Sequence, residues 1–122
     1  VARVTEARAA GADASFVEAP NSLDELAEIG RRAPPPVVAN MIEKGRTPVL
    51  PKQKLAELGF HLILYPLAGL FAATRGLAMI YEKIRDDNTT LGSESQLMAF
   101  DEFNDLIGVE AKYKIAERYG VK

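Results

Sequence analysis

Three polar side chains that could bind or activate a ligand follow short apolar runs of the sequence. Glu18, Asn40 and Tyr65 each lie at or near the end of such a run. In parallel α/β folds the carboxyl ends of the strands share one rim, and ligands bind at that rim. A carboxylate, an amide and a phenol that converge there would suit a small oxygen-rich ligand, or a metal ion reached through water.

Each of these groups also has a structural interpretation. Glu18 can cap the following helix or face water, Asn40 can begin a turn, and Tyr65 can pack at the rim. His61 is interpreted as a structural or surface histidine, because no nucleophile and base can be paired around it. The loop 43–46 is expected to be solvated. These residues alone name no reaction.

The apolar runs are predicted to be strands that alternate with helices. The expected strands are 14–19, 37–41 and 60–65, and the expected helices are 1–10, 23–32, 51–58, 67–85, 101–107 and 110–119. Because these strands are largely apolar, they suit a parallel sheet covered on both faces. Both a barrel sector and a small doubly wound sheet fit this order. A free sheet of this size would leave two apolar edges unpaired, which indicates that neighbouring strands are missing.

Two local patterns predict where helices begin. Ser22 with Glu25, and Ser93 with Gln96, have the spacing of capping boxes, in which a hydroxyl and a longer polar side chain satisfy the free N–H groups of the first turn.

The composition excludes several classes of function. The chain has 122 residues with a net charge of −2, no cysteine and one histidine, so thiolate chemistry, disulfides and histidine-rich metal sites are excluded. No basic block or basic–aromatic pattern indicates nucleic acid as a partner. The apolar stretch 62–71 is broken by Pro66 and Gly69 and is too short to span a membrane. A cytoplasmic location is the expectation.

The order of several motifs resembles the isocitrate lyase/phosphoenolpyruvate mutase superfamily. The segments that carry the resemblance are 9–20, 22–26, 39–48, 58–67 and 100–108, which together follow the family along essentially the whole chain. Within the family, they are most similar to the branch of carboxyvinyl-carboxyphosphonate phosphorylmutase, with methylisocitrate lyase, dimethylmalate lyase, oxaloacetate-cleaving enzymes and the petal death protein as neighbours.

The resemblance implies a (β/α)8 TIM barrel with a helical C-terminal extension. By this analogy residues 1–85 carry about the sixth to eighth strands of the barrel. Residues 86–122 form the extension, which would swap onto a neighbouring protomer in a homo-oligomer, usually a tetramer. The chain opens at Val1 in what reads as the middle of a helix, so we expect a piece of a longer enzyme.

The resemblance also implies an activity and roles for individual residues. The parent would be a carbon–carbon lyase that uses Mg²⁺ to stabilise a pyruvate-type enolate from a 2-hydroxy or 2-oxo dicarboxylate. Glu18 would support the metal through water and touch the substrate, and Asn40 would hydrogen-bond a substrate carboxylate. Pro66 and Leu67 would form part of the wall of the site.

The residues that perform the chemistry are expected upstream of Val1, so the isolated chain is expected to be inactive. Phe71 replaces an arginine of the methylisocitrate lyases, which argues against a tricarboxylate substrate. Because the loop that separates lyases from mutases also lies upstream, a phosphonomutase that forms P–C bonds is an alternative. A non-catalytic scaffold and a small standalone binding module are the remaining alternatives.

Overall fold

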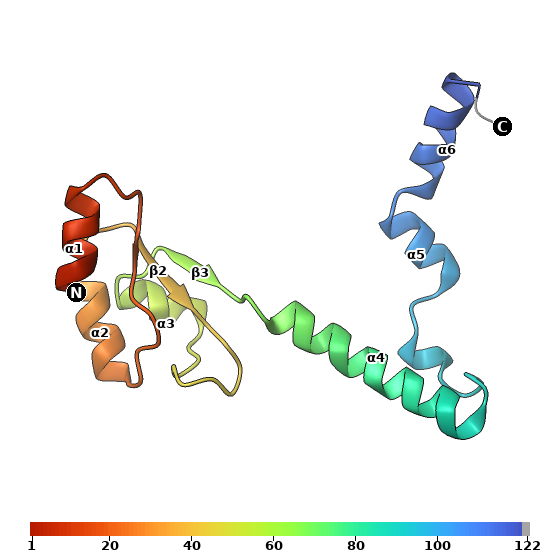
Figure 1. Ribbon diagram of the computed structural model, residues 1–122, viewed down its shortest axis with the longest axis horizontal. Coiled ribbons are helices and arrows are strands. Elements are labelled where there is room, and N and C mark those ends of the chain that lie inside the picture. The colour runs from red at the N-terminus through yellow and green to blue at the C-terminus, as the bar shows by residue number, and fades with distance from the viewer. Residues whose placement is uncertain (121–122) are drawn as a thin grey trace. The chain divides into compact units, whose positions relative to one another are not determined.

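The computed structural model describes residues 1–120 and divides into two units, Val1–Ala73 and a second that begins at Thr74 (Figure 1). The elements of the first unit are α1 (Ala2–Ala9), β1 (Ser15–Phe16), α2 (Leu23–Arg32), β2 (Val37–Asn40), α3 (Lys52–Glu57) and β3 (Leu62–Leu64). Helix α4 (Ala68–Asp87) begins in the first unit and continues into the second. The predicted order of elements is therefore confirmed.

The strands form a parallel sheet in the order β1-β2-β3, with β2 in the centre. Phe16 pairs with Val38, and Val38 pairs with Leu62, so these three side chains lie on one face. The strands are shorter than predicted, because a residue belongs to a strand only where it forms backbone hydrogen bonds with a neighbouring strand. One further hydrogen bond, from Met41 N–H to the Leu64 carbonyl at 2.8 Å, extends the pairing of β2 and β3 beyond the ladder.

One face of the sheet is covered and the other is open. On the covered face, Val37 and Ala39 are buried in a cluster that includes Leu26 of α2 and Leu55 of α3, both 0% exposed. On the opposite face, Phe16 is 40% exposed and Leu62 is 51% exposed. The apolar strands predicted a sheet covered on both faces. Within the first unit, Val1–Ala73, helices cover only one.

Helix α2 begins where the sequence predicted. Ser22 is extended (φ −145°, ψ 165°), and its hydroxyl accepts a hydrogen bond from Glu25 N–H at 3.1 Å. The Glu25 carboxylate in turn accepts from the N–H of Asn21, one residue earlier than a standard capping box requires. The helix ends at Arg32 because Ala33, which precedes a proline, is extended.

Two glycines allow α2 to lie directly against the end of α3. A Cβ added at Gly30 would lie 1.8 Å from the carbonyl oxygen of Leu58. A Cβ at Gly59, whose φ is +99°, would lie 2.6 Å from the carbonyl oxygen of Gly30. Only hydrogen fits at both positions, so the two backbones touch without intervening side chains.

The single histidine joins two strands. His61 N–H donates to the Val37 carbonyl at 2.8 Å, and the His61 Nδ1 accepts from the Val37 N–H at 3.3 Å. The structure therefore gives His61 the structural role that the sequence suggested. Arg8 of α1 donates to the carbonyls of Ala12 and Pro35, which ties α1 to the segment before β2.

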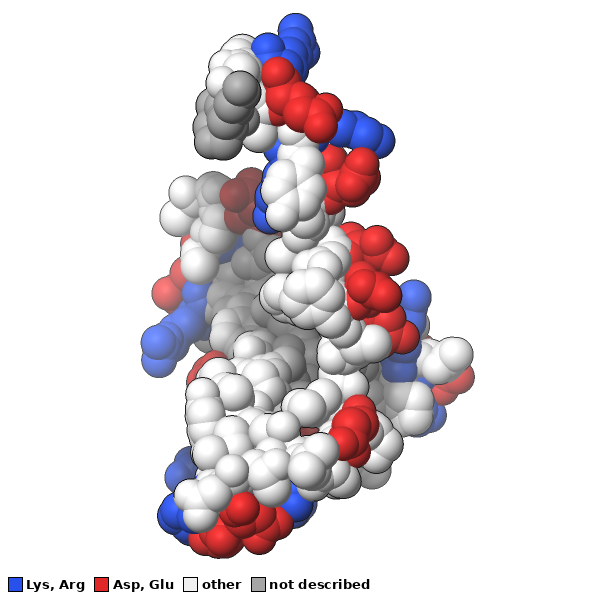
Figure 2. Space-filling model, turned by 90° about the vertical axis from the view of Figure 1, so that its right-hand side faces the viewer, with Lys and Arg blue, Asp and Glu red and all other residues white. Residues whose placement is uncertain are grey.

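The second unit is helical in its described part. After α4 it contains the 3₁₀ helix η1 (Glu94–Gln96), α5 (Phe100–Leu106) and α6 (Val109–Arg118). The predicted capping box at Ser93 is wrong, because Ser93 has a bent backbone and its side chain makes no capping bond. In Figure 2 acidic side chains line one side of these helices, next to uncharged surface. None of the helices in residues 1–120 has the length and apolar character needed to traverse a lipid bilayer.

Candidate functional site

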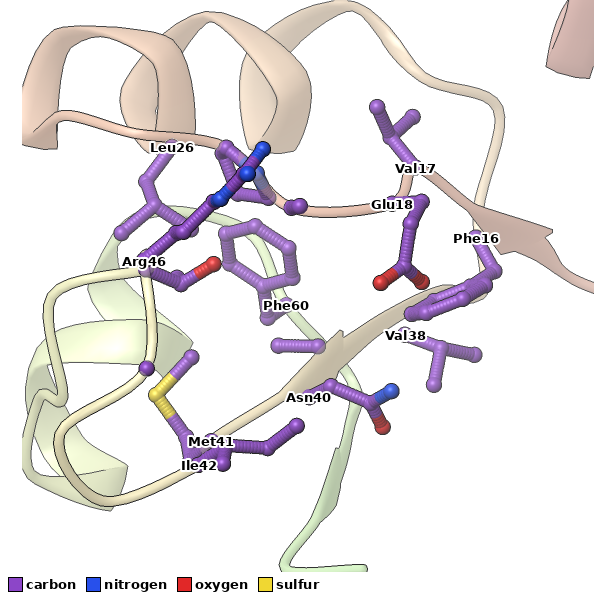
Figure 3. A pocket seen from close by; sticks show the side chains of 15 residues that line it. Phe16, Val17, Glu18, Leu26, Val38, Asn40, Met41, Ile42, Arg46 and Phe60 are labelled. Atoms are coloured by element: carbon purple, nitrogen blue, oxygen red, sulfur yellow. The ribbon is translucent and has the colours of Figure 1, made fainter.

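A cavity of about 380 Å³ opens at the carboxyl ends of β1 and β2 (Figure 3). Its wall combines apolar side chains from the sheet and from α2 with a small number of polar groups. The lining residues of interest are Phe16, Glu18, Leu26, Val38, Asn40, Met41, Arg46, Thr47 and Phe60. A largely apolar cleft with few polar groups is the usual form of a small-ligand site.

Glu18 reaches the cavity because the chain turns sharply just after it. Ala19 has a φ of +49°, a left-handed conformation that alanine rarely adopts, and Pro20 follows. β1 has already ended at Phe16, and the exposed Glu18 side chain, which lies between the strand and this turn, lines the cavity. Glu18 also borders a second cavity of about 500 Å³ between α1 and β1. Strained backbone of this kind often accompanies functional positions.

Asn40 brings an unsatisfied amide to the same end of the cavity. It is the last residue of β2, and its side chain is half-buried. Its Oδ1 atom is buried and has no hydrogen-bond partner among the described residues. A buried acceptor without a partner costs about 1–3 kcal/mol, so a ligand that donates a hydrogen bond there would recover stability. The structure thus brings Glu18 and Asn40 together, as the sequence predicted.

Arg46 is the cavity residue that sequence reasoning missed. The sequence predicted a solvated loop at 43–46, and all four residues are exposed, which confirms that prediction. In addition, Gly45 N–H bonds to the Ile42 carbonyl at 3.0 Å and closes a turn. Glu43 and Lys44 occupy the tip of this turn and do not line the cavity, whereas Arg46 and Thr47 do. The glycine in this short polar loop was the available signal for such a turn.

The other predicted wall residues lie apart from this cavity. Pro66 is exposed and Leu67 is half-buried, and neither belongs to the cavity wall. Tyr65, which is 49% exposed, does not line it either. The structure therefore brings together two of the four predicted site residues.

The electrostatics of the cavity depend on one charge of each sign. Glu18 is its only acidic lining residue and Arg46 its only basic one. Across residues 1–120, no three acidic or histidine side chains cluster closely enough to hold a metal ion. The Glu18 carboxylate and Asn40 amide are oxygen donors of the kind that Mg²⁺ accepts, so they fit a supporting position and not a complete ligand set.

The shifted acids of the chain lie outside the cavity, in the second unit. The pKa of Asp86 lies below its ordinary value because Arg85 donates two hydrogen bonds to it, at 2.7 and 3.0 Å. The pKa of Glu94 is also lowered, first by its own backbone N–H and then by that of Gly92. These groups stabilise local structure and do not contribute to the candidate site.

The protein has a parallel α/β fold with a cavity at the carboxyl rim of its sheet, and the side-chain oxygens of Glu18 and Asn40 make this cavity a candidate ligand site. Comparison with known proteins narrows the class of protein. No family model matches the chain. It is 43% identical to carboxyvinyl-carboxyphosphonate phosphorylmutase of Arabidopsis thaliana over 98% of this chain and 35% of that protein. It is 36% identical to 2,3-dimethylmalate lyase of Eubacterium barkeri, over 90% of this chain and 38% of that protein.

Solved structures agree with these relatives. The crystal structure of 2,3-dimethylmalate lyase, described as a PEP mutase/isocitrate lyase superfamily member, matches with a TM-score of 0.81 and 28% identity. The match covers 97% of this chain and 41% of that chain. Oxaloacetate acetylhydrolase shares the fold, with a TM-score of 0.83 and 23% identity over 99% of this chain and 40% of that chain.

The chain therefore belongs to the isocitrate lyase/phosphoenolpyruvate mutase superfamily. It spans little more than a third of the length of the curated relatives described above, 35% and 38%.

Proposed function

We propose that this chain is part of a Mg²⁺-dependent carbon–carbon lyase that cleaves a 2-hydroxy or 2-oxo dicarboxylate. The observation that carries the proposal is the unpartnered, buried Oδ1 of Asn40 beside Glu18, in a cavity at the rim where parallel α/β enzymes bind ligands. Identities of 36% to a 2,3-dimethylmalate lyase and 34% to a 2-methylisocitrate lyase support the reaction class.

In this proposal Asn40 and Glu18 orient the substrate. The Asn40 amide donates through Nδ2 to a substrate carboxylate and accepts through Oδ1 from a hydroxyl or a water. The Glu18 carboxylate would support the metal through water and would accept a hydrogen bond from the substrate. Asn40 is the last residue of β2 and Glu18 lies two residues after β1, so the paired strands position the backbone of both groups at the rim of the cavity.

The proposed cofactor is Mg²⁺, which would supply Lewis-acid stabilisation of the negative charge that develops on the substrate oxygen. Glu18 is the residue of this chain that would support it, through water. The direct ligands are proposed to lie in other parts of the complete enzyme. By the same reasoning, the 122-residue chain alone would not turn over substrate.

We further propose that the chain supplies about the sixth to eighth strands of a (β/α)8 barrel and that its C-terminal helices join protomers. The open sheet face supports the first point, because Phe16 and Leu62 would face the interior of a closed barrel. The second is supported by large exposed apolar side chains on α5 and α6, including Phe100 at 78% and Tyr113 at 63% exposure. Such surface is typical of an interface.

A phosphonomutase is the second candidate function. Identity of 43% to a carboxyvinyl-carboxyphosphonate phosphorylmutase favours it. Both the lyase and the phosphonomutase would bind an anionic substrate beside Glu18 and Asn40, so this site is compatible with either reaction. The reaction itself distinguishes them.

The test uses the complete polypeptide that contains this chain. We expect Mg²⁺-dependent cleavage of at least one of oxaloacetate, 2,3-dimethylmalate and 2-methylisocitrate, with activity lost in EDTA and restored by Mg²⁺. Glu18→Gln and Asn40→Ala should lower kcat/KM by about 100-fold or more, since each removes charge-assisted or positioned hydrogen bonds. Glu6→Gln, at an exposed glutamate of α1 outside the cavity wall, is the matched control.

Two outcomes would contradict the lyase proposal. Failure to cleave all three substrates, together with turnover of phosphoenolpyruvate, would favour the mutase. Magnesium-dependent cleavage by the purified 122-residue chain would contradict the proposal that the direct metal ligands lie elsewhere.

A further inference from the structure

We propose that Arg46 binds the second carboxylate of the substrate, at the end of the cavity opposite Glu18 and Asn40. The inference rests on the proposed function, because it takes the cavity as the substrate site. It adds a specificity-determining residue, through which the site would prefer a dianion over a monoanion of the same length.

The turn before Arg46 determines which basic residue of the loop reaches the cavity. Lys44, with a φ of +57°, lies at the turn tip, and the bond from Gly45 N–H to the Ile42 carbonyl reverses the chain after it. Arg46 therefore lines the cavity, while Lys44, two residues earlier and of the same charge, does not. The geometry thus selects one cation from a loop that contains two.

Arg46 is available for a ligand. None of the ion pairs or side-chain hydrogen bonds found among residues 1–120 engages Arg46. Five other lysines and arginines of α2, α3, α4 and α6 pair with an acid of their own helix: Arg32, Lys54, Lys83, Arg85 and Lys114. None of these ion pairs joins Arg46 to Glu18, the acid that lines the cavity among the described residues. A guanidinium that faces a cleft without a counterion is suited to a carboxylate, which it can bind through two parallel hydrogen bonds.

The two polar ends of the cavity are separated. Figure 3 shows Glu18 and Asn40 at one end and Arg46 at the other, with Phe60 between them. The buried side chains of Leu26 and Met41, both 0% exposed, complete this middle section of the wall. A substrate that spans the cavity would place one anionic end near Glu18 and its metal, and a second near Arg46. A monocarboxylate would leave Arg46 without a partner.

Binding of two matched probes tests the inference. L-malate and 2-hydroxybutyrate have the same carbon chain and differ by one carboxylate, and their affinities for the complete enzyme can be measured by calorimetry in Mg²⁺ buffer. Arg46→Gln should weaken malate binding about 10- to 100-fold and leave 2-hydroxybutyrate binding unchanged, because only malate reaches the guanidinium. Arg46→Lys should lose part of this factor, since an ammonium keeps the charge but not the paired geometry.

Lys44→Gln is the matched control, because it removes the same charge from the same loop outside the cavity wall. Its malate affinity should equal that of the wild type. Equal weakening of both probes by Arg46→Gln, or no weakening of malate, would overturn the inference. If the enzyme cleaves none of the lyase substrates but malate binding still depends on Arg46, the proposed reaction fails and the role of Arg46 stands.

Discussion

Replacing Gly30 by alanine should destabilise the first unit, although the same replacement usually strengthens a helix. The added Cβ would lie 1.8 Å from the Leu58 carbonyl oxygen and 2.8 Å from its carbon. Ordinary contacts begin near 3.4 Å. The obstructing atoms are backbone, so they cannot rotate away as a flexible side chain would, and α2 must separate from the end of α3.

The size of the effect follows from opposing contributions. Alanine is favoured over glycine inside a helix by about 1 kcal/mol. Overpacking costs about 1–3 kcal/mol, and more where the backbone must move. Separation of the helices would also loosen the buried cluster that contains Leu26 and Leu55. We therefore expect a net loss of about 2 kcal/mol in the free energy of unfolding.

Urea denaturation of the chain, followed by circular dichroism at the helix band, measures this loss as a lower midpoint. Gly76→Ala is the control, because Gly76 is a helical glycine of α4 whose added Cβ meets nothing within 4 Å. That variant should be as stable as the wild type or more stable, by up to about 1 kcal/mol. A Gly30→Ala midpoint equal to or above that of the wild type would refute the close approach of α2 and α3.

Three further predictions concern single side chains. Ser22→Ala should lower the unfolding free energy by about 1 kcal/mol by removing the hydroxyl that caps α2, and Ser22→Asp should restore it in the same urea assay. Asn40→Leu should stabilise the chain by about 1 kcal/mol, because a buried unpaired oxygen is removed, while the complete enzyme loses substrate affinity by calorimetry. The pKa of Glu94 should be lower in the folded chain than in the unfolded one, because its own N–H and that of Gly92 favour the carboxylate. Its contribution to stability is thus present above the unfolded pKa and lost as pH falls through the folded pKa. Carboxyl NMR titration measures this shift, and an ordinary value would show that the hydrogen bonds are absent.

The order and type of most elements could be predicted from the sequence because local signals and tertiary structure agree. The spacing of Ser22 and Glu25 predicts the start of α2, and the proline after Ala33 predicts its end. The strand lengths could not be predicted, since a ladder depends on which neighbour pairs with each residue. At Ser93 the spacing was right but the backbone was not extended, so the hydroxyl could not cap the short helix η1.

For the candidate site, the polar residues at the strand ends could be predicted from the sequence, whereas the direction of the side chains in the loop could not. Glu18 and Asn40 were recognisable because each is a polar residue that follows an apolar strand. Arg46 looked like one of several charges in a polar loop, and only the turn closed by Gly45 distinguishes it from Lys44. Lys44 and Arg46 are two positions apart in the sequence, and their spacing alone does not tell which side chain faces the cavity until the turn type is known.

The hydrogen bond between His61 and Val37 has a consequence for spectroscopy. A ring nitrogen that accepts a hydrogen bond cannot carry the proton, so the neutral imidazole holds its proton on Nε2 while β2 and β3 are paired. The nitrogen chemical shifts of the two tautomers differ widely, and the chain contains one histidine. A single resonance, obtained without assigning the rest of the spectrum, would therefore report whether the centre of the sheet is intact.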